Sequence, residues 1–177
     1  MRKLLKSLKD SIDLQVPAPP HDLFHALVEA MAKMRGRPIE LRIVEFPEGA
    51  GTTGLVVEMA DRYLVVVEES TDPLHQLVIL GHELWHLHAG HCAHGLAGGV
   101  AARALGSGVD AQELAHVVAA RTQFEQHNES EAEAFGYRLG AACGGWLAGT
   151  PEARTPIRLN EVGGRINASL GYHGPQG

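Results

Sequence analysis

The sequence has little of what marks secreted, membrane-spanning or nucleic-acid-binding proteins. It holds only two cysteines, Cys92 and Cys143, which are too few for a disulfide framework. No apolar run approaches the length of a membrane span, and Lys6, Lys9 and Asp10 interrupt the early leucines where a secretory signal needs an unbroken apolar stretch. The net charge of −6 provides no general attraction to nucleic acid. We therefore expect a cytoplasmic protein that does not bind DNA directly.

The length of 177 residues suits a single domain that can bury a core without disulfide bonds. We expect residues 1–149 to form this domain. Within it, residues 92–109 are rich in glycine and alanine and lack large anchoring side chains, which is typical of a mobile loop. Such a loop is either a lid over a site or a connection without function. Residues 150–177 have little periodicity and several prolines and glycines, so we expect a loosely ordered tail.

Residues 75–87 are mostly apolar, and they contain the pattern His-Glu-x-x-His, which places two imidazoles and a carboxylate close together. On a helix, His82 and His86 would lie one turn apart on the same face and could share one tetrahedral zinc ion. Glu83 would stand beside them, where its carboxylate would not be a ligand but would reach a water molecule next to the metal and act as general base of hydrolysis. The alternative is that both histidines are hydrogen-bonded members of an ordinary core.

Residues outside the motif predict that this segment is a helix. Asp72 is a favourable N-cap and Pro73 is favourable at the first helical position, while Gly90 is typical of a helix end. Apolar side chains recur between them at intervals of three and four, namely Leu77, Leu80, Leu84 and Leu87. We expect a helix that buries its leucines and presents its histidines on the other face.

The segment before this helix changes to the alternation of a β-sheet. Residues 39–46 alternate apolar and charged side chains, and residues 54–69 contain two β-branched runs around a short turn. These patterns predict a small antiparallel sheet packed on the His-Glu-x-x-His helix. An edge strand there could bind an extended peptide by strand addition. Equally, the sheet could serve only to support the helix.

Four further segments have helical periodicity, namely residues 2–14, 21–35, 110–121 and 127–140. The first is amphipathic, with lysines around an apolar face formed by Leu4, Leu8 and Ile12. Such a helix either packs on its own domain or lies on a membrane surface, and we expect the former.

A second group of histidines follows the motif, with His88, His91 and His94 around Cys92. On a continuing helix His88 and His91 would point away from the His82/His86 face, so we expect a solvated loop rather than a second metal site. Sequence does not choose an oxyanion-stabilising residue among several candidates, namely Tyr63, His127, Tyr137, Arg165, Tyr172 and His173.

Residues 82–86 (HELWH) and 129–135 (ESEAEAF) together resemble the ImmA/IrrE family of metallopeptidases, which carries a His-Glu-x-x-His helix and a later Glu-x-x-Ala-x-x-Phe helix. The resemblance spans roughly residues 20–145. It implies a zinc peptidase with a glutamate as third ligand, commonly partnered with a helix-turn-helix repressor that is its substrate or antitoxin. The chain departs from the family pattern at Gly136, where Ala is frequent, and at Glu133, where Asn or Asp is frequent.

The third ligand is expected on the later helix. Glu131 would point to a different side, whereas Glu125, Glu129 and Glu133 follow one another at intervals of four and would share a face. Asn128 and Glu131 form a capping pair that would start the helix at Asn128, leave Glu125 in the preceding loop and place Glu129 in the first turn. The family resemblance also points to Glu129. It further suggests that Glu133 orients a ligating histidine.

The sequence thus predicts an α+β, zincin-like domain that binds Zn²⁺ through His82, His86 and Glu129. We expect it to be an endopeptidase that acts on a regulatory protein, a helix-turn-helix repressor or antitoxin, with Glu83 as the general base. The alternative is a metal-binding interaction module that sequesters a transcription regulator without cutting it.

Overall fold

A computed structural model of the chain describes residues 1–46, 52–91 and 129–150. The expected loop 92–109, helix 110–121 and tail after residue 150 lie outside the described residues. The described elements, in chain order, are α1 (Arg2–Asp10), α2 (Pro20–Arg35), β1 (Ile39–Val44), β2 (Gly54–Glu58), β3 (Tyr63–Glu68), α3 (Pro73–Ala89), α6 (Glu129–Cys143) and the short 3-10 helix η1 (Gly144–Trp146).

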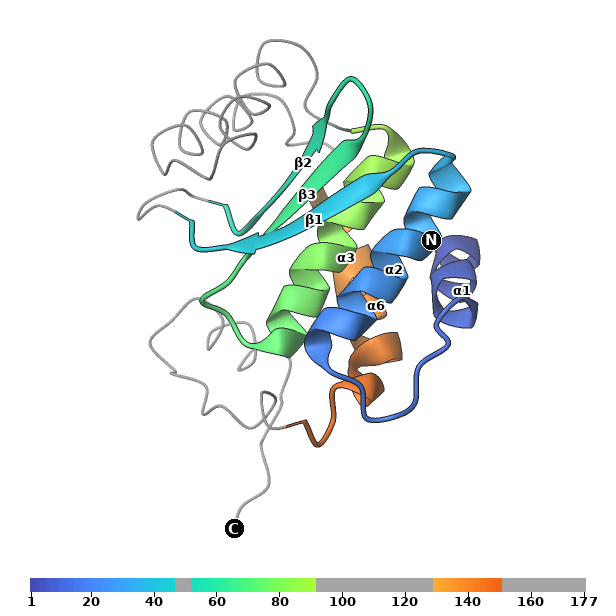
Figure 1. The fold of residues 1–177 in the computed structure, drawn as a ribbon, viewed down its shortest axis with the longest axis vertical. Helices are drawn as coiled ribbons and strands as arrows, with labels where there is room; N and C mark the ends of the chain where they lie inside the picture. The colour runs from blue at the N-terminus through green and yellow to red at the C-terminus, as the bar shows by residue number, and fades with distance from the viewer. Residues whose placement is uncertain (47–51, 92–128, 151–177) are drawn as a thin grey trace.

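The α+β architecture expected from the sequence is confirmed, and its described part is layered (Figure 1). Helices α2 and α3 pack on one face of the sheet, α2 against β1 and α3 against β2 and β3. Helix α6 packs on α3, and α1 packs on both α2 and α6. Helix α3 therefore lies at the centre, between the sheet and α6.

The sheet has the order β1-β3-β2 and is mixed. Strands β2 and β3 form the expected antiparallel hairpin, in which Val56 faces Val65. Strand β1 pairs parallel to β3, with Leu41 beside Val65, so the prediction of a wholly antiparallel sheet is wrong for β1. The physical reason is that β1 does not pair with the strand that follows it. Residues 45–62, which contain β2, form the long connection that a parallel pair needs.

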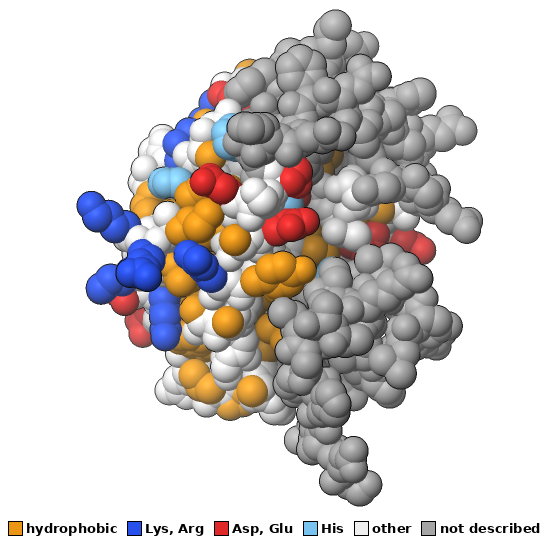
Figure 2. Space-filling view, turned by 180° about the vertical axis from the view of Figure 1, so that it is seen from behind, with side chains coloured by type: hydrophobic (Ala, Val, Ile, Leu, Met, Phe, Trp, Pro, Cys, Tyr) orange, Lys and Arg blue, Asp and Glu red, His pale blue; other side chains and the backbone are white. Residues whose placement is uncertain are grey.

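Helix α1 packs its apolar face on its own domain. Leu4 and Leu8 are buried in the main core, while Lys3, Lys6 and Lys9 are exposed. Lysine and arginine side chains gather at the edge of the molecule where α1 lies (Figure 2). Because the apolar face is already buried, it is not presented to a membrane surface. No helix within the described ranges is both long and apolar enough to cross a bilayer.

Candidate metal centre

Helix α3 has the boundaries that its sequence predicts. The Asp72 carboxylate accepts hydrogen bonds from the backbone N–H groups of Leu74 and His75 at 3.0 and 3.1 Å, and Pro73 occupies the first helical position. At the other end Gly90 has φ of 80°, the left-handed conformation that glycine adopts without strain. This frame holds residues 82 and 86 on one face of a regular helix.

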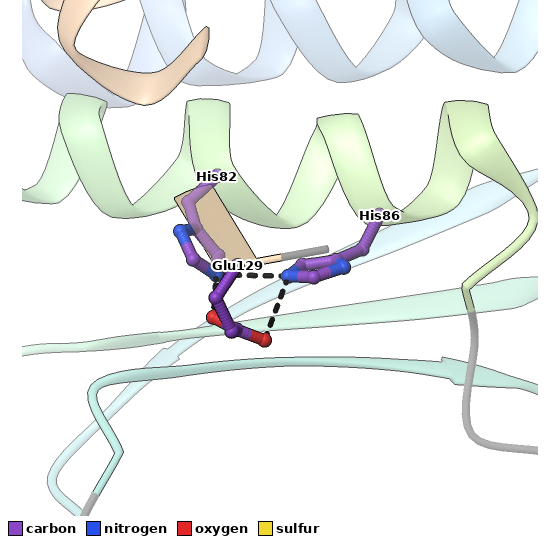
Figure 3. Close-up of side chains that lie close together, drawn as sticks. All are labelled: His82, His86 and Glu129. Carbon is purple, nitrogen blue, oxygen red and sulfur yellow. Dashed lines mark hydrogen bonds and ion pairs between the residues drawn. The ribbon is translucent and has the colours of Figure 1, made fainter. Parts of the chain in front are cut away.

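The two motif histidines and Glu129 come together at one place (Figure 3). The Nε2 atoms of His82 and His86 are 2.9 Å apart. Glu129, in the first turn of α6, places Oε2 3.2 Å from His82 Nε2 and Oε1 3.5 Å from His86 Nε2. Within the described ranges these side chains form a group whose ligand atoms all lie within 4.8 Å of one another. The three residues could hold a metal ion.

The three candidate ligand side chains differ in exposure, so the site has a buried side and a side open to solvent. The side chain of His86 is fully buried, that of His82 is 19% exposed and that of Glu129 is 41% exposed. Both imidazoles direct Nε2 towards the same carboxylate, so a cation between them would meet two neutral donors and one anionic donor. Glu129 lies in the first turn of α6, where the helix N-terminus faces the carboxylate.

The histidine face of α3 is less open than the sequence predicts. The four leucines of the predicted stripe are buried, as expected, but His86 is buried as well. The expectation that the helix presents both histidines to solvent is therefore wrong for His86. The reason is the central place of α3, which has neighbours on both sides instead of one.

Glu83 points to a different neighbour from the histidines. Its residue is only 2% exposed, and it does not belong to the group of three ligand candidates. A Cβ atom on Gly54, the first residue of β2, would lie 2.6 Å from Glu83 Oε1 and 2.7 Å from Ile79 Cγ2. Since real side chains avoid such contacts, Gly54 leaves the space that the Glu83 carboxylate occupies between α3 and β2. Sequence reasoning missed this role of Gly54, because nothing near it in the chain points to α3.

Glycines also allow α6 to approach α3 closely. A Cβ on Gly136 would lie 2.5 Å from the carbonyl oxygen of Val78, and one on Gly81 would lie 2.9 Å from Gly136 Cα. The ring of Phe135 packs beside that of Trp85, with centroids 5.3 Å apart. Sequence reasoning missed the role of Gly81. An interior helical glycine costs about 1 kcal/mol of stability relative to alanine. Its presence inside the predicted helix was therefore the sequence signal that could have indicated a close contact at Gly81.

Other acidic residues of α6 stand apart from the ligand group. Glu131 and Glu133 are exposed and do not belong to the group of three. Glu125 and Asn128 lie outside the described residues. The supporting role expected for Glu133 thus stays a prediction, to be tested by substitution.

Of the second histidine group, His91 lies beside the ligand candidate His86 and not away from it as expected, while Cys92 and His94 lie outside the described residues. The backbone N–H of His91 donates to the carbonyl oxygen of His86 at 2.8 Å, and the two imidazole centroids are 6.0 Å apart. Burial, and then the positive charges of the N-terminus and Arg35, lower the pKa of His88. Tyr63 lies under the guanidinium of Arg37, whose Cζ is 4.7 Å from the ring centroid.

Of the remaining oxyanion candidates, one lies within the described residues. Tyr137 is half-buried on α6. The others lie outside the described residues, namely His127, Arg165, Tyr172 and His173.

Cys143 is buried, and this burial raises the pKa of its thiol to about 11, so it is protonated at neutral pH and is a poor nucleophile.

No protein-family model, curated protein or solved structure matches the chain. The resemblance to the ImmA/IrrE metallopeptidases therefore rests on the two motifs alone. What the structure adds is their juxtaposition, since residues 82–86 and Glu129 meet in space.

Proposed function

We propose that the chain is a zinc-dependent endopeptidase of the His-Glu-x-x-His type with Glu129 as third ligand. The observation that carries the proposal is the convergence of His82, His86 and Glu129, with Glu83 beside them but not among them. Two histidines and one glutamate are an established ligand set of catalytic zinc, which leaves the fourth position open.

The distances between the donor atoms fit a tetrahedral ion of this size. Ligand atoms about 2.1 Å from a tetrahedral zinc ion are about 3.4 Å from one another. The observed separations are 2.9 Å between the two Nε2 atoms and 3.2 and 3.5 Å from these atoms to the carboxylate oxygens. Small shifts of the side chains would therefore suffice to hold the ion.

Glu83 is the residue of this chain suited to move the proton. Bound zinc would polarise the scissile carbonyl and make water a better nucleophile at neutral pH. The Glu83 carboxylate accepts the proton of the water molecule whose oxygen attacks the carbonyl carbon. As the C–N bond breaks, the same carboxyl group delivers the proton to the leaving amine nitrogen. Burial at 2% exposure keeps this carboxylate away from bulk water.

The place of Glu83 suggests how a peptide would approach. In the described part of the sheet β2 is at one edge, and its first residue, Gly54, lies against the Glu83 carboxylate. We propose that an extended segment pairs with this strand, whose first residue lies beside the general base. This favours peptide binding by the sheet over a purely supporting role.

The substrate class follows from the family resemblance and belongs to the proposal. We infer that the substrate is a regulatory protein, a helix-turn-helix repressor or antitoxin. The alternative function, in which the metal centre only helps to sequester such a regulator, would use the same three ligands. Metal content therefore cannot separate the two functions.

Incubation of the purified, zinc-loaded chain with the product of a neighbouring helix-turn-helix gene separates them. Mass spectrometry of the mixture should show two fragments of the regulator that add up to the intact protein plus one water. The Glu83→Gln variant, handled identically, should yield none. Stable complex formation without fragments, with zinc present throughout, would instead support the sequestering module.

A further inference from the structure

We propose that the first two turns of α2 carry a second site for a late first-row divalent cation, separate from the centre on α3. His21 and His25 are four residues apart on this helix, and their ring centroids are 4.2 Å apart. The corresponding distance for His82 and His86 is 4.6 Å. The two pairs thus share a spacing and a ring separation that allow one metal ion to contact both imidazoles.

Both histidines line a pocket of about 400 Å³ between α2 and the connection that follows α1. Three carboxylates also line it, and they outnumber the single ammonium group, that of Lys33. The carboxylates belong to Asp13, Asp22 and Glu29. Their negative charge offsets the unfavourable effect that a helix N-terminus has on a nearby cation.

One carboxylate is placed to orient an imidazole. Asp22 Oδ1 lies 3.4 Å from Nδ1 of His21. Occupation of Nδ1 by this contact leaves Nε2 of His21 as the donor for a metal, which is the arrangement that ligating histidines commonly have. Both histidines are exposed, so the remaining coordination positions would be filled by water.

The donor set determines the metal class and the strength of binding. Imidazole nitrogen suits Zn²⁺, Ni²⁺ and Cu²⁺ better than Mg²⁺ or Ca²⁺. With two protein ligands, this site binds more weakly and exchanges faster than the three-ligand centre on α3.

The test uses the full-length chain already loaded with zinc and titrated with Ni²⁺. Equilibrium dialysis should show a second, weaker binding class, and the ring-proton NMR signals of His21 and His25 should broaden first as paramagnetic Ni²⁺ is added. His21→Asn and His25→Asn should each abolish the weaker class. Because both residues are exposed, neither change disturbs the core.

Two control variants separate this proposal from the function proposed above. His88→Asn removes an exposed histidine of α3 and should leave the weaker class intact. Glu129→Gln should weaken the tight class only. Absence of a weaker class in the wild-type chain, its persistence in His25→Asn, or its loss in His88→Asn would each overturn the second site.

Discussion

At the scale of single residues, a change at Glu83 can separate the proposed metal binding from the proposed hydrolysis. Glu83→Gln should bind zinc nearly as well as the wild type, because the side chain lies outside the ligand group. It should lose at least about a thousandfold in hydrolysis, since an amide cannot accept the proton of water. Zinc analysis of the purified variant and single-turnover cleavage of the regulator provide the two readouts. Full cleavage by the variant would remove Glu83 as the base.

The identity of the third ligand is decided by a matched series of glutamate variants on one helix. Glu129→Gln should lose most bound zinc, because its two oxygens are the ones near both imidazoles. Glu131→Gln, an exposed neighbour on the same helix, is the control and should bind normally. If Glu133 orients a histidine, Glu133→Gln should weaken zinc binding by about ten- to a hundredfold. A zinc-loaded Glu129→Gln variant would show that the ligand assignment is misplaced.

The sequence sufficed for residues whose role depends on helical spacing. His82 and His86 lie four apart, so their shared face could be expected from spacing, whereas the choice of Glu129 also rested on the resemblance to the ImmA/IrrE pattern. Gly54 could not be found in this way. Its role depends on the Glu83 carboxylate, which reaches it only through the packing of α3 on β2.

At the scale of elements, the crossing of α3 and α6 positions Glu129, the proposed third ligand. An alanine at Gly136 would gain about 1 kcal/mol of helix propensity in isolation. Its Cβ would nevertheless lie 2.5 Å from the Val78 carbonyl oxygen, so the helices must separate. We expect Gly136→Ala to lose about 1–3 kcal/mol of stability and to bind zinc more weakly, because Glu129 moves with α6.

The control for this crossing is Gly145→Ala. A Cβ at Gly145 has no atom within 4 Å, and the residue has no positive φ, so the substitution is expected to be neutral. Urea unfolding and zinc competition with a chelating dye measure the two effects. Equal zinc affinity in Gly136→Ala and the wild type would show that close packing does not set the position of Glu129.

Element boundaries were predictable where local chemistry fixes them, as at Asp72 and Gly90 of α3. The orientation of β1 was not. Alternating side chains occur in parallel and antiparallel pairs alike, so the pattern of residues 39–44 does not distinguish them. The choice depends on which edge of the β2–β3 hairpin remains for β1, and this is a property of the whole sheet.

At the scale of the whole molecule, the proposed metal centre would connect parts of the chain that are distant in sequence. His82 and His86 come from the central helix, whereas Glu129 comes from a helix that begins more than forty residues later. The unfolded chain does not hold these groups together. Zinc binding therefore favours the folded state over the unfolded state.

Zinc should consequently raise the melting temperature of the wild-type chain. At a free zinc concentration a hundred times the dissociation constant, linkage contributes about 2.7 kcal/mol, which corresponds to roughly 5–10 °C for a chain of this length. Differential scanning calorimetry with zinc, and again after addition of a chelator, measures the gain and its reversal. Glu129→Gln should show little of it at the same zinc concentration, whereas Glu131→Gln should respond like the wild type. Identical melting curves of the wild type with and without zinc would count against a metal centre built from the two helices, because binding to the folded state alone must stabilise that state.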